Sequence, residues 1–151
     1  MTDLAMSEFK AGNINKSIAA LKNESNKGNV DASFTLARIY YHGLGMEVDR
    51  NAAEHILRKL RQPEARMLLA DLLCTEAGTT GYVEACSIYS ELAAAGDMVA
   101  MYKLALVHQT LGRLDLASSG LMTVIYSDVS TEKLKVKAQR SLNELGAENA
   151  S

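Results

Sequence analysis

The apolar residues of the chain recur in four similar stretches. Each stretch contains a pair of a leucine and an alanine, and the pairs are Leu4-Ala5, Leu36-Ala37, Leu69-Ala70 and Leu104-Ala105. The separations between successive leucines are 32, 33 and 35 residues, and each of the last three leucines has an alanine four positions before it. A period of this length is typical of proteins that are built from stacked structural repeats.

A second apolar set follows each pair and begins at a small residue, which is Ser17, Ala53, Ala85 or Ala117. Apolar or small residues follow at the third and fourth positions, which places them on one helical face. Each unit is therefore predicted to contain two amphipathic helices, and the small residue lets the second helix lie close to the first. The predicted fold is all-α: a single-domain, right-handed α-α superhelix (solenoid) of about four helix-turn-helix repeats and about nine helices. The repeats span about 1–27, 28–62, 63–95 and 96–129.

The connection within a unit varies in length. The leucine of the pair and the small residue are 13 positions apart in the first and last units, 17 apart in the second and 16 apart in the third. The additional residues fall at 43–45 and 78–81, where glycines permit the left-handed backbone that ends many helices. We expect looped connections at these two places and tight turns at Gly12 and Gly112.

One stretch carries a recognisable motif. In residues 28–53 the order is Ala32, Leu36-Ala37, Tyr40, Gly43-Leu-Gly45, Val48-Asp49 and Ala52-Ala53. This stretch resembles the SEL-one-like (Sel1-like) variant of the tetratricopeptide repeat, and the units with the 13-residue spacing resemble ordinary tetratricopeptide repeats. The third unit lacks the Gly-x-Gly, Tyr and Val-x-x-Asp elements, and the first has Glu24 where the pattern has an apolar residue. The resemblance implies an α-solenoid that binds other proteins and has no catalytic residues.

Helix boundaries are predicted from capping residues. Asn29 or Asp31 is placed to cap the first helix of the second unit, and Asp49 its second helix. Asp97 is placed to cap the first helix of the fourth unit. Pro63 is suited to the first position of a helix, where no backbone N–H is needed.

A final helix is predicted over residues 130–146, with Gly146 as its end. Leu134, Ala138, Leu142 and Leu145 form one apolar face, and the basic residues between Lys133 and Arg140 lie largely off it. A solenoid needs such a helix to cover its last open face. The basic run is interpreted as the solvated face of this capping helix.

Composition narrows the class of partner. The chain of 151 residues has a formal net charge of −2 and is 48% hydrophobic. Scattered basic residues do not favour a nucleic-acid partner, because phosphate binding needs several convergent Lys or Arg side chains. No segment approaches the roughly 18 apolar residues of a transmembrane helix, and residues 1–10 lack the features of a signal peptide. We therefore expect a cytoplasmic protein without a membrane or nucleic-acid partner.

Candidate chemistry is sparse. Cys74 and Cys86 are the only cysteines, and two reduced packing residues are favoured over a redox pair. None of the three histidines has a second ligand three or four positions away, so no metal or other cofactor is expected. The favoured interpretation is that the protein is not an enzyme. The alternative is a small enzyme whose polar groups are Asp71, Cys74 and His108.

The binding face is predicted by setting aside the helix residues that are expected to pack inward. In the second unit Phe34, Arg38 and Tyr41 form a stripe beside the packing face, with His42 at its end. The predicted partner-binding residues, which we call the stripe, are Phe34, Arg38, Tyr41, His42, Met67, Asp71, Cys74, Tyr102, Leu106, Gln109, Met6 and Phe9. In tetratricopeptide-like solenoids this stripe lines the concave groove. The alternative is that these side chains pack between helices.

The predicted function is to bind a protein or peptide along the concave face. A bacterial adaptor, a chaperone and a cognate inhibitor of the immunity type are all compatible with a short solenoid. A self-associating structural solenoid is a further alternative, and the oligomeric state, monomer or weak dimer, is left open by the sequence.

Overall fold

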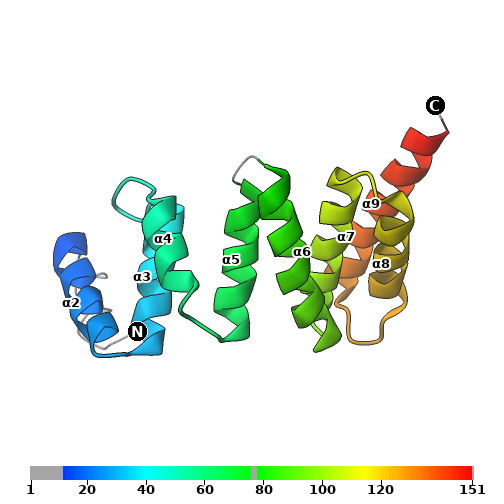
Figure 1. Ribbon diagram of the computed structural model, residues 1–151. Coiled ribbons are helices and arrows are strands. Elements are labelled where there is room, and N and C mark those ends of the chain that lie inside the picture. Colours follow the sequence, from blue (N-terminus) through cyan, green and yellow to red (C-terminus); the bar gives the residue numbers. More distant parts are fainter. Residues whose placement is uncertain (1–11, 76–77, 151) are drawn as a thin grey trace. The chain divides into compact units, whose positions relative to one another are not determined.

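The computed structural model describes residues 12–75 and 78–150. Every regular element in these ranges is an α-helix, which confirms the predicted all-α fold (Figure 1). The helices are α2 (Ile14–Asn26), α3 (Val30–His42), α4 (Arg50–Leu57), α5 (Pro63–Thr75), α6 (Thr79–Ala94), α7 (Met98–Thr110), α8 (Leu114–Tyr126) and α9 (Glu132–Asn149). The helix expected around Leu4 and Ala5 lies outside the described residues.

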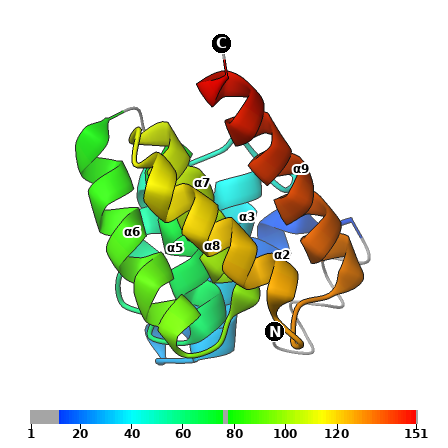
Figure 2. The same ribbon diagram turned by 90° about the vertical axis from the view of Figure 1, so that its right-hand side faces the viewer.

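The chain forms two compact units, Met1–Leu72 and Leu73–Ser151, with the boundary inside α5. In the first unit α3 packs against both α2 and α4. In the second unit α7 packs against α6 and α8, and α8 also packs against α9 (Figure 2). Within each unit, therefore, these helices pack against their neighbours along the chain, which is the arrangement of helical repeats. The exact repeat boundaries remain a prediction.

The predicted small residues are all buried. Ser17, Ala53, Ala85 and Ala117 are all 0% exposed. The residues four positions later, Leu21, Leu57, Tyr89 and Leu121, are also buried. Each second helix of a repeat therefore turns the predicted face inward.

The apolar pairs are buried in the second and third repeats, at Leu36-Ala37 and Leu69-Ala70. In the fourth repeat Ala105 is buried but Leu104 is only half-buried. Leu104 lines a hollow on the surface between α7 and α8.

The helices α7 and α8 approach closely at a glycine. A Cβ atom added to Gly120 would lie 3.0 Å from the Cβ of Ala105. This is tighter than nine in ten contacts of a Cβ atom in ordinary packing. The small side chains at these two positions therefore set the distance between α7 and α8.

The connection between α3 and α4 is held by its glycines and by backbone hydrogen bonds. Gly43 ends α3 with a φ of +66°. The N–H of Asp49 donates to the carbonyl of Tyr40 at 3.0 Å, which fixes the start of α4 beside the end of α3. Gly45 has a φ of +73°, and a Cβ there would collide with the side chain of Ile14 on α2. The predicted looped connection is therefore confirmed, and it also contacts the preceding repeat.

Three predicted caps are confirmed. The side chains of Asn29, Asp49 and Asp97 each accept a backbone N–H two or three residues later, at distances of 2.9 to 3.0 Å. The cap of α3 is thus Asn29, and Asp31 lies in the first turn of that helix. Pro63 occupies the first position of α5 as predicted.

Two predicted boundaries are wrong. The helix α9 continues past Gly146 to Asn149, because a glycine ends a helix only where it adopts a left-handed conformation, and Gly146 does not. The connection expected over 78–81 is shorter than predicted, since α6 begins at Thr79 and includes Gly81. Gly12 and Gly112, by contrast, have the positive φ expected of tight turns.

The helix α9 covers the apolar face of the second unit. Leu134, Ala138 and Leu145 are buried in one cluster with residues of α7 and α8, and Leu142 packs against that cluster. Thr131 caps the helix by accepting from the N–H of Leu134. The prediction of a capping helix is confirmed. Its basic residues Lys133, Lys137 and Arg140 are exposed, and Lys135 is half-buried.

Candidate functional site

The stripe is most open on α3. Arg38 and His42 are exposed, and Phe34 and Tyr41 are half-buried. The guanidinium carbon of Arg38 lies 6.0 Å from the centre of the Phe34 ring. The rings of Tyr41 and His42 meet edge to face with 4.8 Å between their centres. The first unit therefore has an aromatic and basic surface along one side of α3.

The other described members of the stripe lie on α5 and α7. Met67, Asp71 and Cys74 are half-buried on α5, and Tyr102, Leu106 and Gln109 are half-buried on α7. Tyr102 packs against the apolar cluster of the second unit, and its hydroxyl lies 3.3 Å from Oγ of Ser141 on α9. The Tyr102 side chain is thus partly engaged in contacts with the capping helix. Met6 and Phe9 lie outside the described residues.

In the enzyme alternative, Asp71 or Cys74 would form a hydrogen bond with His108. The structure shows no such bond at the Nδ1 atom of His108. Asp71 and Cys74 lie on α5, and His108 lies on α7. The Nδ1 atom of His108 is buried and has no hydrogen-bond partner among the described residues. Neither the thiol nor the carboxylate therefore bonds to this nitrogen. Burial, and to a smaller extent the charge of Arg113, lowers the pKa of His108, which favours its neutral form.

Cys74 and Cys86 form no disulfide with each other, and both are half-buried. Burial raises the pKa of Cys86, and the nearby Arg113 offsets this in part. A raised pKa lowers the fraction of reactive thiolate, which agrees with a packing role for Cys86. The described parts of the chain contain no group of three or more His, Cys, Asp or Glu side chains that could hold a metal ion. In these parts no helix is long and apolar enough to cross a membrane.

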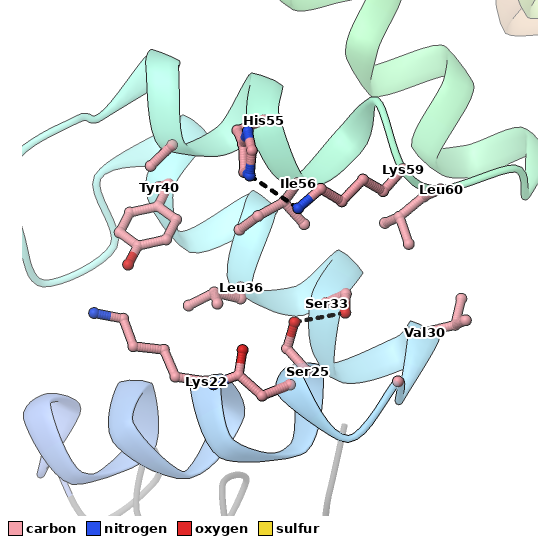
Figure 3. A pocket seen from close by; sticks show the side chains of 13 residues that line it. Lys22, Ser25, Val30, Ser33, Leu36, Tyr40, His55, Ile56, Lys59 and Leu60 are labelled. Atoms are coloured by element: carbon pink, nitrogen blue, oxygen red, sulfur yellow. Dashed lines mark hydrogen bonds between the residues drawn. The ribbon is translucent and has the colours of Figure 1, made fainter.

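A groove that the sequence analysis did not predict lies in the first unit. It has a volume of about 600 Å³ and is formed by α2, α3, α4 and the turns that follow α2 and α4 (Figure 3). Its floor is apolar and contains Leu36, Tyr40, Ile56 and Leu60. Phe34, Arg38 and Tyr41 are not among its lining residues, so the groove and the stripe use different faces of α3. We call it the α2–α4 groove.

Polar side chains of the α2–α4 groove are arranged on its two walls (Figure 3). On the α4 side, Nζ of Lys59 lies 2.9 Å from Nε2 of His55. Because an ammonium group has only donors, Nε2 accepts this hydrogen bond. On the α2 side, Nζ of Lys22 lies 5.9 Å from the centre of the Tyr40 ring. The hydroxyls of Ser25 and Ser33 bond to each other at 2.7 Å.

The second unit has a smaller hollow of about 200 Å³ between α7 and α8. It is lined by Met101, Leu104, Ala105, His108, Leu116, Ser119, Gly120 and Thr123. Aligning the apolar pairs places Leu104 at the position of Leu36 and His108 at that of Tyr40. The hollow therefore occupies the same place in the fourth repeat as the groove does in the second.

Lys22 and Lys59 were not predicted as site residues because they belong neither to the apolar positions of the repeat nor to the stripe. Lys22 follows the small residue Ser17 by five positions, and Lys59 follows Ala53 by six. In the third repeat Ser90 stands five positions after Ala85, and in the fourth Thr123 stands six positions after Ala117. The signal that could have drawn attention to this face was the change of residue at each of these two offsets from one repeat to another.

Comparisons with known proteins agree with the repeat architecture. No family model matches the chain, and no curated protein matches it. Among solved structures, the crystal structure of MamA is similar with a TM-score of 0.68 and 19% sequence identity, over 99% of this chain and 98% of that one. A Sel1 repeat protein from Oxalobacter formigenes is similar with a TM-score of 0.63 and 22% identity. That match covers 91% of this chain and 59% of the other.

At these identities the similarity establishes the fold. The chain has the fold of the helical repeat proteins of the Sel1 and tetratricopeptide type. This agrees with the resemblance carried by residues 28–53, and with helices that pack in sequence within each unit.

Proposed function

We propose that the protein binds a protein or peptide partner through the stripe, with the α3 side chains Phe34, Arg38 and Tyr41 at its centre. Repeat proteins of this fold generally mediate protein–protein interaction. The observation that carries the proposal is the open aromatic and basic surface along α3, where Arg38 is exposed beside the half-buried Phe34. Tyr, Phe, Met and Arg are enriched at protein interfaces, and arginine and tyrosine frequently supply most of the binding energy.

The proposed role is that of a non-catalytic bacterial adaptor, chaperone or cognate inhibitor in the cytoplasm. Two half-buried cysteines that form no disulfide with each other are compatible with a reducing compartment. A net charge of −2 does not favour nucleic acid as the partner. The protein is proposed to act as a monomer or weak dimer.

The test is affinity capture of the full chain from cells that express it naturally, followed by mass spectrometry. The proposal expects one protein in stoichiometric amount with the bait. Capture of no stoichiometric protein at physiological salt, from extracts in which the bait is folded, would count against the proposal.

Light scattering, which measures the oligomeric state, distinguishes the self-associating solenoid from this proposal. A monomer at high concentration excludes stacking through open repeat ends. The small enzyme is separated by substituting His108 with Gln, which removes its basic nitrogen. A covalent change in the captured partner that the wild type causes and His108→Gln does not, read by mass spectrometry of the intact partner, would favour the enzyme; no such change supports a role without acid–base chemistry.

A further inference from the structure

We propose that the α2–α4 groove is a second binding site, which takes an acidic segment of a partner protein that also carries an apolar side chain. The groove uses a different face of α3 from the stripe, so this site is separate from the one proposed above. The inference rests on the proposed function only in that the occupant is a polypeptide.

The groove is cationic in a protein whose formal net charge is −2. Lys22 stands on the α2 wall and Lys59 on the α4 wall (Figure 3). None of the thirteen lining residues is an aspartate or a glutamate. The two lysines therefore present positive charge to the groove from opposite sides, with no carboxylate in its lining.

The acidic residues of the two walls are already paired elsewhere. Glu24 is the acidic residue of α2, and it pairs with Lys27 at 2.9 Å. Glu54 is the acidic residue of α4, and it pairs with Arg58 at 2.7 Å. In the part of the chain that the structure describes, Lys22 and Lys59 have no carboxylate partner. An incoming carboxylate would supply one.

The contact with His55 leaves Lys59 able to bind a second group. The ammonium of Lys59 has three N–H donors, and the 2.9 Å hydrogen bond to Nε2 of His55 uses one of them. The imidazole therefore positions the ammonium beside the groove and leaves two donors for an occupant. A hydrogen bond between an ammonium and a carboxylate is charge-assisted and stronger than a neutral one.

The floor indicates that the occupant is not a simple anion. Leu36, Tyr40, Ile56 and Leu60 give the bottom of the groove an apolar surface. An apolar side chain of the occupant would cover this surface and remove it from water. Two lysines are also fewer than the convergent basic side chains that nucleic-acid binding requires. A polypeptide with acidic residues on either side of an apolar one matches both the walls and the floor.

The fourth repeat provides an internal comparison. When the apolar pairs and the small residues of the two repeats are aligned, Tyr40 corresponds to His108, His55 to Ser119 and Lys59 to Thr123. The hollow at that place is also smaller, at about 200 Å³ against about 600 Å³. The fold therefore does not require a wide cationic groove at this position. The lysine pair is a property of the first unit.

The test is a selection of phage-displayed random peptides on the immobilised full chain. The proposal expects enriched peptides that carry Asp or Glu on both sides of Leu, Ile or Phe. A synthetic peptide of the enriched sequence is then measured by fluorescence anisotropy against the wild type and the double variant Lys22→Glu with Lys59→Glu. Binding to the variant is expected to fall by about tenfold or more. Binding of the peptide to the wild type is also expected to weaken as the salt concentration is raised.

The matched control is Lys133→Glu with Lys137→Glu, which makes the same change of net charge at two exposed residues of α9. The control is expected to bind the peptide almost as well as the wild type. The milder pair Lys22→Gln with Lys59→Gln, checked by circular dichroism, serves if the glutamates disturb folding. Enrichment without acidic residues, no enrichment at all, or equal loss in the control would overturn the proposal.

The two binding sites are distinguished by their variants. If a partner captured from cells is lost on changing Arg38 and Tyr41, and if no acidic peptide is selected, then the α2–α4 groove proposal fails and the stripe proposal stands. If acidic peptides depend on Lys22 and Lys59 while the Arg38 and Tyr41 changes affect no partner, the stripe proposal fails instead.

Discussion

Arg38 and Leu36 lie two positions apart on α3 and occupy opposite environments. The Leu36 side chain is 4% exposed, whereas the Arg38 side chain is exposed and its guanidinium lies over the edge of the half-buried Phe34. One helix therefore separates a face that holds the repeat together from a face that is open to a partner. Substitutions on the two faces should have different consequences.

The first prediction compares these two faces by chemical denaturation. Leu36→Ala should lower the free energy of unfolding by about 2 to 5 kcal/mol, because it removes a buried side chain and leaves a cavity. Arg38→Glu with Tyr41→Ala should leave the circular dichroism helical and unfolding cooperative, since surface changes are usually small. Loss of helicity in the second variant would show that the stripe is part of the core.

The second prediction concerns the glycine loop after α3. Gly45→Ala should destabilise the protein by about 1 to 3 kcal/mol, because alanine is strained at a φ of +73° and its Cβ would collide with Ile14. Gly146→Ala is the matched control. Gly146 lies within α9, and an added Cβ there meets no other atom, so alanine should stabilise the helix by about 0.5 to 1 kcal/mol. Equal effects of the two changes on the urea midpoint would contradict this account of the loop.

The third prediction concerns the close approach of α7 and α8. Gly120→Leu should cost about 1 to 3 kcal/mol, since the helices must separate to accommodate the larger side chain next to Ala105. Ser119→Leu on the exposed side of the same helix should change the free energy of unfolding very little. The midpoint of thermal unfolding measures both variants, and a loss in Ser119→Leu as large as in Gly120→Leu would argue against this packing.

The fourth prediction concerns His108 and pH. Its pKa is lowered in the folded protein by burial first and by the charge of Arg113 second, whereas the unfolded chain has the ordinary histidine value of about 6.5. As the pH falls below that value, the unfolded state takes up a proton more readily than the folded state. The contribution of His108 to stability is therefore complete above about pH 6.5 and is lost as the pH falls through the folded pKa.

Denaturation at a series of pH values, with wild type and His108→Gln, measures this effect. The variant should show a smaller loss of stability below about pH 6.5. Arg113→Gln should raise the His108 pKa only in part, as followed by an NMR titration of the imidazole, because burial is the larger cause. An identical pH profile for wild type and His108→Gln would contradict the prediction.

Much of the fold was predictable because the same pattern of small and apolar residues recurs in each repeat. Ser17, Ala53, Ala85 and Ala117 differ in sequence context, yet all are small and all are buried. The caps Asn29, Asp49 and Asp97 were predictable because capping depends on residues next to each other in the chain. Local chemistry therefore accounts for the helices and for their faces.

The parts that were not predicted depend on tertiary context. Gly146 was expected to end α9, but it does not adopt the left-handed conformation and the helix continues to Asn149. A glycine within a helix costs only about 1 kcal/mol, so the residue type alone does not decide where the helix ends. The α2–α4 groove depends on how the side chains of three successive helices leave space between them, and Lys22 and Lys59 are ordinary exposed lysines.

The most direct test of the central claim is quantitative affinity capture from the native cell with three baits. These are the wild type, Arg38→Glu with Tyr41→Ala, and the control Arg140→Glu on the exposed side of α9. The account predicts one stoichiometric protein on the wild type and on the control, reduced by about tenfold or more on the double variant, as for the loss of interface hot spots. Recovery of the same protein in equal amounts on all three baits, or on none, would contradict the claim that the stripe binds a partner.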